Sequence, residues 1–70
     1  MVNIFGKRLK ELREDRGLSM KKLSELVNIG IASISRWEKE MTIVNGDQLI
    51  IFANFFNVST DYLLGITNDY

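Results

Sequence analysis

Residues 31–41 combine side chains that can recognise nucleic-acid bases with side chains that belong in a protein core. A step of 100° per residue, as in an α-helix, divides this stretch into two faces. The small, polar and basic residues share one face: Ala32, Ser35, Arg36 and Lys39. The apolar residues share the other: Ile34, Trp37 and Met41. Such a helix is suited to bury its apolar face and to enter the major groove of DNA with the other.

The outward residues have defined chemical uses in such a groove. Arg36 can donate two parallel hydrogen bonds to a guanine, whereas Ala32 and Ile31 can contact the methyl group of a thymine. Ser33 and Ser35 are further candidates for base contacts, and Lys39 is a candidate for a phosphate contact. The alternative is that the two basic residues are solvated surface charges, which is the commonest state of arginine and lysine.

The rest of the sequence lacks the usual means of catalysis. It contains no cysteine and no histidine, which excludes disulfides, thiolate zinc sites, thiol nucleophiles and imidazole acid–base chemistry. The carboxylates form no recognisable catalytic arrangement, and 70 residues leave little room for a pocket. We therefore expect no enzyme, no metal, no cofactor and no small-molecule substrate.

Composition argues against a membrane protein. Apolar residues make up 46% of the sequence and charged residues 26%, and no apolar run approaches the roughly 20 residues that a membrane span requires. The first ten residues contain neither a signal peptide nor a lipidation motif. We expect a soluble, cytoplasmic protein without a membrane partner.

The charges are divided between the two halves of the chain. The formal net charge is zero, but all nine basic residues lie in residues 7–39, which also hold five acidic residues. Residues 40–70 contain four acidic residues and no basic one. This asymmetry predicts one basic face and one neutral or acidic face, although a chance distribution explains it equally well.

Capping patterns divide the chain into five short helices. A hydrophobic staple places apolar residues five apart around an N-cap residue, and four such patterns predict helix starts near residues 19, 30, 45 and 59. Gln48 is expected to complete a capping box with Asn45. A first helix over about residues 3–16 carries an apolar stripe of Phe5, Leu9 and Leu12, and Gly17 ends it. We therefore expect one all-α domain over residues 1–65 and a frayed tail over residues 66–70.

Residues 19–39 have the spacing of a helix-turn-helix. The second helix carries Leu23, Leu26 and Val27 on one side, and three residues separate it from the third helix. Asn28 tolerates the left-handed conformation that such a turn requires, and Gly30 can begin the next helix. Because generic helix hairpins also use short turns, this spacing favours DNA binding without establishing it.

Three separated segments resemble the phage repressor/Cro (Xre-type) helix-turn-helix family in the same order and spacing. The central segment is LSMKKLSELVNIGIASISRWE, residues 18–38. Upstream, RLKELREDRG at residues 8–17 is similar to the first helix of the family, and FFNVSTDYLLG at residues 55–65 is similar to its last helix. The resemblance covers nearly the whole chain and implies a five-helix, lambda-repressor-like DNA-binding domain.

The family resemblance also implies partners and residue roles. Members usually bind double-stranded operator DNA as homodimers, so we expect a sequence-specific transcriptional regulator, with repression favoured, on a palindromic operator. The start of the second helix is then the phosphate-binding part: Ser19, Met20 and Lys21. The resemblance further implies a structural ion pair between Arg13 and Glu38.

Departures from the family pattern leave a second function open. The family commonly has glutamine where Met20 stands, polar residues where Ile31 and Ala32 stand, and glycine near Glu40. Hydrogen-bonded base readout is therefore thin, and specificity would depend on methyl contacts and DNA shape. The alternative is a protein-interaction module, such as an antirepressor or a partner-controlled subunit, that keeps the fold with weak or no DNA binding.

The predicted fourth helix is apolar on two sides. Its inner face is a complete apolar stripe that consists of Leu49, Phe52, Ala53 and Phe56. Ile51 and Phe55 remain on the far side, and a helix that is apolar nearly all round must be covered on both sides. We expect these two residues to form a dimer interface, with Ile66 and Tyr70 as further candidates. The alternative is that the last helix covers them.

Overall fold

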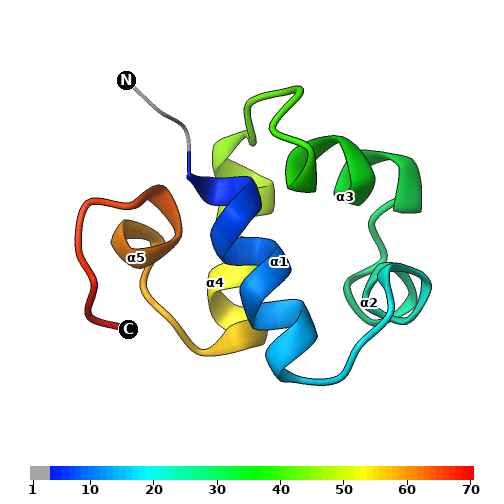
Figure 1. Cartoon of the computed structure of the whole chain (residues 1–70), viewed down its shortest axis with the longest axis horizontal. Coiled ribbons are helices and arrows are strands. Elements are labelled where there is room, and N and C mark those ends of the chain that lie inside the picture. Colours follow the sequence, from blue (N-terminus) through cyan, green and yellow to red (C-terminus); the bar gives the residue numbers. More distant parts are fainter. Residues whose placement is uncertain (1–3) are drawn as a thin grey trace.

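The protein, described over residues 4–70 by a computed structural model, consists of five α-helices (Figure 1). They are α1 (Phe5–Asp15), α2 (Met20–Val27), α3 (Ile31–Glu38), α4 (Gly46–Phe56) and α5 (Thr60–Leu64). Residues 4–70 contain no strand, so the predicted all-α class with five helices is confirmed. The predicted first-helix start, at residue 3, lies outside the described residues.

Local capping explains where the helices begin. The side-chain oxygens of Ser19, Asn45 and Ser59 each accept a hydrogen bond of 2.9–3.0 Å from the backbone N–H three residues further on. Each bond satisfies one of the N–H groups that a helix start leaves without a partner. Gly30 is the N-cap residue of α3. The four predicted helix starts are therefore confirmed.

The core lies where α1, α3 and α4 meet. Figure 1 shows α1 crossing in front of α4, with α2 and α3 on one side and α5 on the other. The rings of Phe5, Trp37 and Phe52 form a mutual cluster with centroids 5.6–6.0 Å apart. Trp37 is only 4% exposed, so its predicted place in the core is confirmed. This burial fixes which face of α3 turns outward.

Two residues predicted to face inward are exposed. Met41 is 70% exposed because α3 ends at Glu38 and the chain reverses at Glu40, which has a φ of 59°. Leu26 is 50% exposed. A helical step of 100° per residue places Leu26 to one side of Leu23. In α2 only Leu23 is buried against the rest of the domain.

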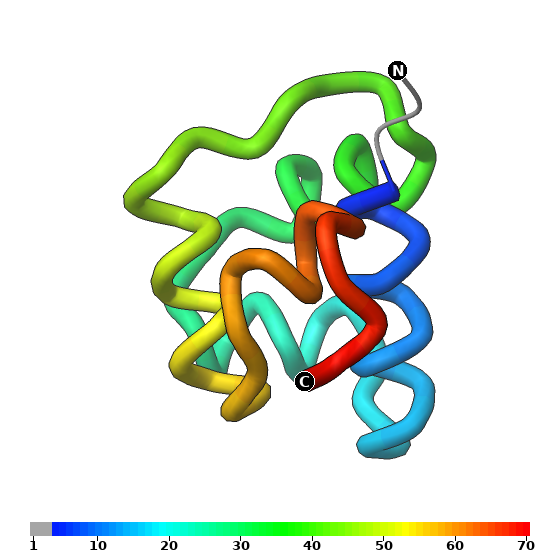
Figure 2. The backbone as a smooth tube through the Cα atoms, turned by 90° about the vertical axis from the view of Figure 1, so that its left-hand side faces the viewer, coloured from blue at the N-terminus to red at the C-terminus, as the bar shows by residue number. Residues whose placement is uncertain are grey.

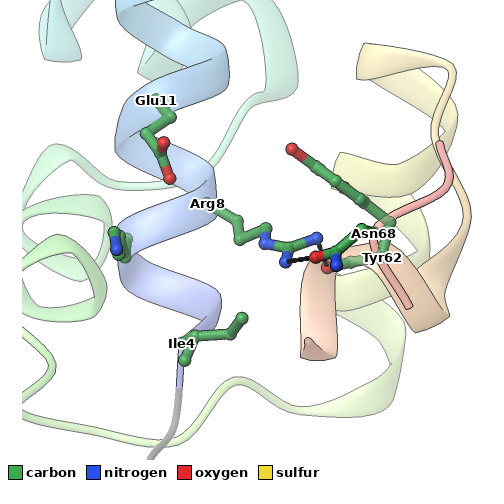
Figure 3. A pocket seen from close by; sticks show the side chains of 6 residues that line it. Ile4, Arg8, Glu11, Tyr62 and Asn68 are labelled. Carbon is green, nitrogen blue, oxygen red and sulfur yellow. Dashed lines mark hydrogen bonds between the residues drawn. The ribbon is translucent and has the colours of Figure 1, made fainter. Parts of the chain in front are cut away.

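The segment after α5 folds back onto the domain, so the expectation of a frayed tail was wrong. Arg8 donates hydrogen bonds of 2.9 Å to the carbonyl oxygen of Thr67 and 2.8 Å to Oδ1 of Asn68, and its guanidinium lies 4.0 Å from the ring centroid of Tyr62 (Figure 3). The backbone N–H of Ser59 also donates to the carbonyl oxygen of Tyr70 at 3.2 Å. Figure 2 shows this segment beside α1 and α5.

Candidate nucleic-acid interface

The turn between α2 and α3 is held by two hydrogen bonds that involve Ser24. Asn28 adopts the left-handed conformation, with φ 57° and ψ 43°, as its residue type predicted. The N–H of Ile29 donates to the carbonyl oxygen of Ser24 at 3.2 Å, and the Ser24 hydroxyl donates back to the carbonyl oxygen of Ile29 at 2.5 Å. Sequence reasoning missed Ser24, although serine hydroxyls commonly bond to nearby backbone groups.

The outward face of α3 is the one that the helical period predicted. Ala32, Arg36 and Lys39 are exposed, while Ile34 and Trp37 on the other face are buried. Because α3 begins directly after the turn, its first residues project from a corner of the molecule (Figure 1). A small side chain at the centre of the face lets the helix backbone approach another surface closely.

The other predicted base contacts are less accessible. Ile31, at the start of α3, is 48% exposed. Ser33 and Ser35 are half-buried, since they lie on the flanks of α3 between the outward and the core face. The two serines therefore lie at the edges of the outward face, whereas Ala32 and Arg36 occupy its centre.

The three predicted phosphate contacts at the start of α2 differ in their exposure and in their bonding. Lys21 is exposed, and Ser19 uses its hydroxyl to cap the helix, accepting from the N–H of Lys22 at 3.0 Å. Met20 is half-buried and packs against the core, so its side chain is part of the packing of the domain. What the first turn of α2 offers an anion is therefore a lysine and backbone N–H groups.

A buried ion pair ties α1 to the end of α3. Nε of Arg13 lies 2.7 Å from Oε2 of Glu38, and Nη2 lies 2.9 Å from Oε1. Nη1 of Arg13 also donates to the carbonyl oxygen of Leu18, just before α2, at 2.8 Å. The hydrogen bond with Glu38 raises the pKa of Arg13 above its usual value. One arginine, at the position that the family resemblance implied, thus holds both helices of the helix-turn-helix against α1.

Three basic residues are used by the fold. Arginines in α1 and directly after it donate to backbone carbonyl groups of other segments: Arg8, Arg13 and Arg16. Their acceptors lie in α5 and the segment after it, just before α2, and at the end of α4. The basic residues that remain exposed around the helix-turn-helix are Lys21, Lys22, Arg36 and Lys39. Lys7 and Lys10 on α1 are exposed as well.

The far side of α4 is partly apolar. Ile51 is 40% exposed, and the neighbouring Ile50 is 53% exposed. Phe55 is half-buried and packs edge-on against Phe56, with ring centroids 4.9 Å apart. Tyr70, another candidate for this surface, lies instead against Tyr62, at a centroid distance of 4.7 Å. The two predicted interface residues on α4 therefore differ in their packing: Phe55 packs against the core, whereas Ile51 does not.

Residues 4–70 hold no cluster of three or more metal-ligating side chains. Within the same residues, no helix is long and apolar enough to cross a membrane. An open cleft of 270 Å³ between α1 and the C-terminal segment is lined by Arg8, Glu11, Tyr62 and Asn68 (Figure 3). The Arg8 guanidinium in this cleft is already bound to protein oxygens.

Residues 9–63 match the helix-turn-helix family. The chain belongs to this family. It is similar to the HTH-type transcriptional regulator ImmR of Bacillus subtilis, with 45% identity over 61 residues, which is 87% of this chain and 48% of that protein. It is also similar to the transcriptional regulator YobD of the same organism, with 36% identity over 94% of this chain and 59% of that protein. The chain thus spans about half the length of these relatives.

A solved structure of the helix-turn-helix family has the same fold. The P22 c2 repressor protein, crystallised in complex with synthetic operator 9T, superposes with a TM-score of 0.81 and 28% identity. The match covers 90% of this chain and 96% of the repressor chain. The predicted phage-repressor family and its five-helix, lambda-repressor-like domain are therefore confirmed.

Proposed function

We propose that this helix-turn-helix domain is the DNA-reading part of a transcriptional regulator, and that the regulator acts as a repressor in the cytoplasm. The observation that carries the proposal is the orientation of α3. Trp37 and Ile34 fix its inner face, and the opposite face exposes Ala32, Arg36 and Lys39. Transcriptional regulators among its relatives and the P22 c2 repressor bound to an operator support the same conclusion.

In the proposed complex, α3 lies in the major groove of double-stranded DNA. Arg36 donates two hydrogen bonds to a guanine, and Ala32 and Ile31 contact thymine methyl groups. Ser33 and Ser35 contact the edges of neighbouring bases. Lys39 binds a phosphate at the end of α3, while Lys21 and the N–H groups that follow Ser19 bind another at the start of α2. Met20 contributes only its backbone.

We propose that the domain binds as a homodimer on a palindromic operator. A monomer offers four exposed basic side chains around the helix-turn-helix, and few phosphate contacts give modest affinity. A second copy doubles both the phosphate and the base contacts. The exposed side chain of Ile51, flanked by Phe55, is the surface proposed to bring the two copies together.

Selection of bound duplexes from a random pool tests this function directly. We expect the enriched sequences to share two inverted half-sites with centres about one helical turn, 34–36 Å, apart. A single enriched half-site would contradict the dimer and leave DNA reading intact. Recovery of no shared sequence at low salt would contradict DNA reading and favour a protein-interaction module.

A further inference from the structure

Every helix of the described chain stops at a residue in the left-handed conformation. The five residues have φ values between 57° and 84°: Gly17, Asn28, Glu40, Asn57 and Gly65. Glycine and asparagine adopt this conformation at low cost, which accounts for four of the five. The exception is the residue that follows α3, where a glutamate occupies the strained position.

The backbone around Glu40 forms a helix stop that favours glycine. The N–H of Glu40 donates to the carbonyl oxygen of Trp37, and the N–H of Met41 donates to that of Arg36, both at 2.9 Å. These two bonds define a Schellman motif, whose left-handed residue is most often glycine. A hydrophobic contact frequently accompanies the motif, but Met41 is largely exposed. Nothing in this local packing calls for a glutamate side chain.

Glu40 lies just after the end of α3, next in the chain to a residue of the proposed interface. Glu40 is exposed and directly follows Lys39, the proposed phosphate contact. Within residues 4–70, the acidic residue that forms a salt bridge is Glu38, so the charge of Glu40 is not neutralised by an ion pair. Strained backbone that persists at a functional site points to a role for the residue there.

We propose that Glu40 is an electrostatic brake on DNA binding. Resting on the proposed function, the brake repels the phosphate backbone and lowers affinity for duplex DNA of any sequence. It leaves the preference between sequences unchanged, because repulsion of the phosphate backbone does not depend on the base sequence. In water, two like unit charges about 7 Å apart repel each other by an energy that corresponds to roughly three-fold in affinity. Removing one of the charges removes this penalty, and salt screens it.

The test compares Glu40→Gln with the wild-type chain. This substitution removes the charge and keeps both the side-chain length and the left-handed backbone. Affinity is measured by fluorescence anisotropy with a selected operator and with a random duplex of equal length. The charge control is Asp69→Asn, which lies in the C-terminal segment on the far side of α1 from α3 (Figure 1).

We expect Glu40→Gln to bind both duplexes roughly three-fold tighter at ~50 mM salt and to lose this advantage at ~500 mM salt. We expect Asp69→Asn to bind as the wild type does. Equal affinities of Glu40→Gln and wild type would overturn the brake while leaving DNA binding in place. Weaker binding of Glu40→Gln to the operator alone would also overturn it, because the carboxylate would then be reading a cytosine. If no variant binds any duplex, the proposed function and the brake both fail.

Discussion

At the scale of single residues, α3 has a buried Trp37, an exposed Arg36 and, just after its end, a left-handed Glu40. The inward position of Trp37 and the outward position of Arg36 follow from the helical period. The left-handed conformations of Gly17 and Asn28 follow from residue type. The position of Glu40 could not be predicted in this way, because it depends on where α3 ends, and residue type argues against it.

The left-handed position of Glu40 makes a prediction about stability. We expect Glu40→Gly to raise the free energy of unfolding by about 1 kcal/mol, since relief of left-handed strain exceeds the added flexibility of glycine in the unfolded chain. For a domain of this size that corresponds to a rise in Tm of about 4–8 °C. Thermal unfolding followed by circular dichroism measures it.

Gly17→Ala is the matched control for the stability of Glu40→Gly. Gly17 has a φ of 67° and nothing within 4 Å of where a Cβ would stand. The substitution therefore adds left-handed strain without a clash, and we expect Tm to fall by a similar amount. An unchanged or lower Tm for Glu40→Gly, together with a lower Tm for Gly17→Ala, would show that Glu40 is not strained.

At the scale of helices, starts were predictable and packing was not. The caps at Ser19, Asn45 and Ser59 are local hydrogen bonds, so the sequence alone indicates them. The exposure of Leu26 and the donation of Arg16 to the carbonyl oxygen of Phe56 depend on how helices meet. The same holds for the angle of α3, which Ser24 and the Arg13–Glu38 pair help to set.

The contact between α1 and α3 predicts a strict requirement for glycine at position 6. A Cβ on Gly6 would overlap the carbonyl oxygen of Trp37, a backbone atom that cannot move away alone. We expect Gly6→Ala to lower the free energy of unfolding by about 3 kcal/mol or more, because it drives α3 away from the core. Urea unfolding measures the loss.

The control for Gly6→Ala is Gly46→Ala, at the first residue of α4. No atom lies within 4 Å of the added Cβ there, so we expect alanine to stabilise the helix by roughly 0.5–1 kcal/mol. If Gly6→Ala were as stable as the wild type, the close approach of α1 to α3 would be incorrect.

At the scale of the whole molecule, the charge division of the sequence has a structural basis. The basic half contains α1, α2 and α3, but the guanidinium groups of Arg8, Arg13 and Arg16 are bound to carbonyl groups. The basic residues that remain exposed are divided between α1, with Lys7 and Lys10, and the helix-turn-helix. The half without basic residues supplies α4, α5 and the returning C-terminal segment. Counting charges from sequence therefore overestimated the positive charge available to DNA, because the count includes three arginines that are bound within the fold.

The apolar side of α4 makes a prediction about assembly. We expect Ile51→Asp to shift the protein from dimer to monomer in sedimentation velocity, because a carboxylate would be buried without a partner at the interface. Ile51 is partly exposed in the single chain, so the fold should persist.

The control for Ile51→Asp is Ile43→Asp, in the connection between α3 and α4. Ile43 is 83% exposed, and we expect this variant to sediment as the wild type does. A wild-type protein that stays monomeric even when bound to its operator would contradict the dimer, as would an Ile51→Asp variant that still dimerises.

The central claim is that Arg36 reads a guanine, and a cycle of one protein variant and one base analogue tests it most directly. Each guanine shared by the selected half-sites is replaced in turn with 7-deazaguanine, which lacks the N7 acceptor. At one position we expect wild-type affinity to fall roughly ten-fold, within the ~1–3 kcal/mol of a bidentate arginine–guanine contact, and Arg36→Ala to be insensitive. Equal losses for wild type and Arg36→Ala at every guanine would contradict the central claim.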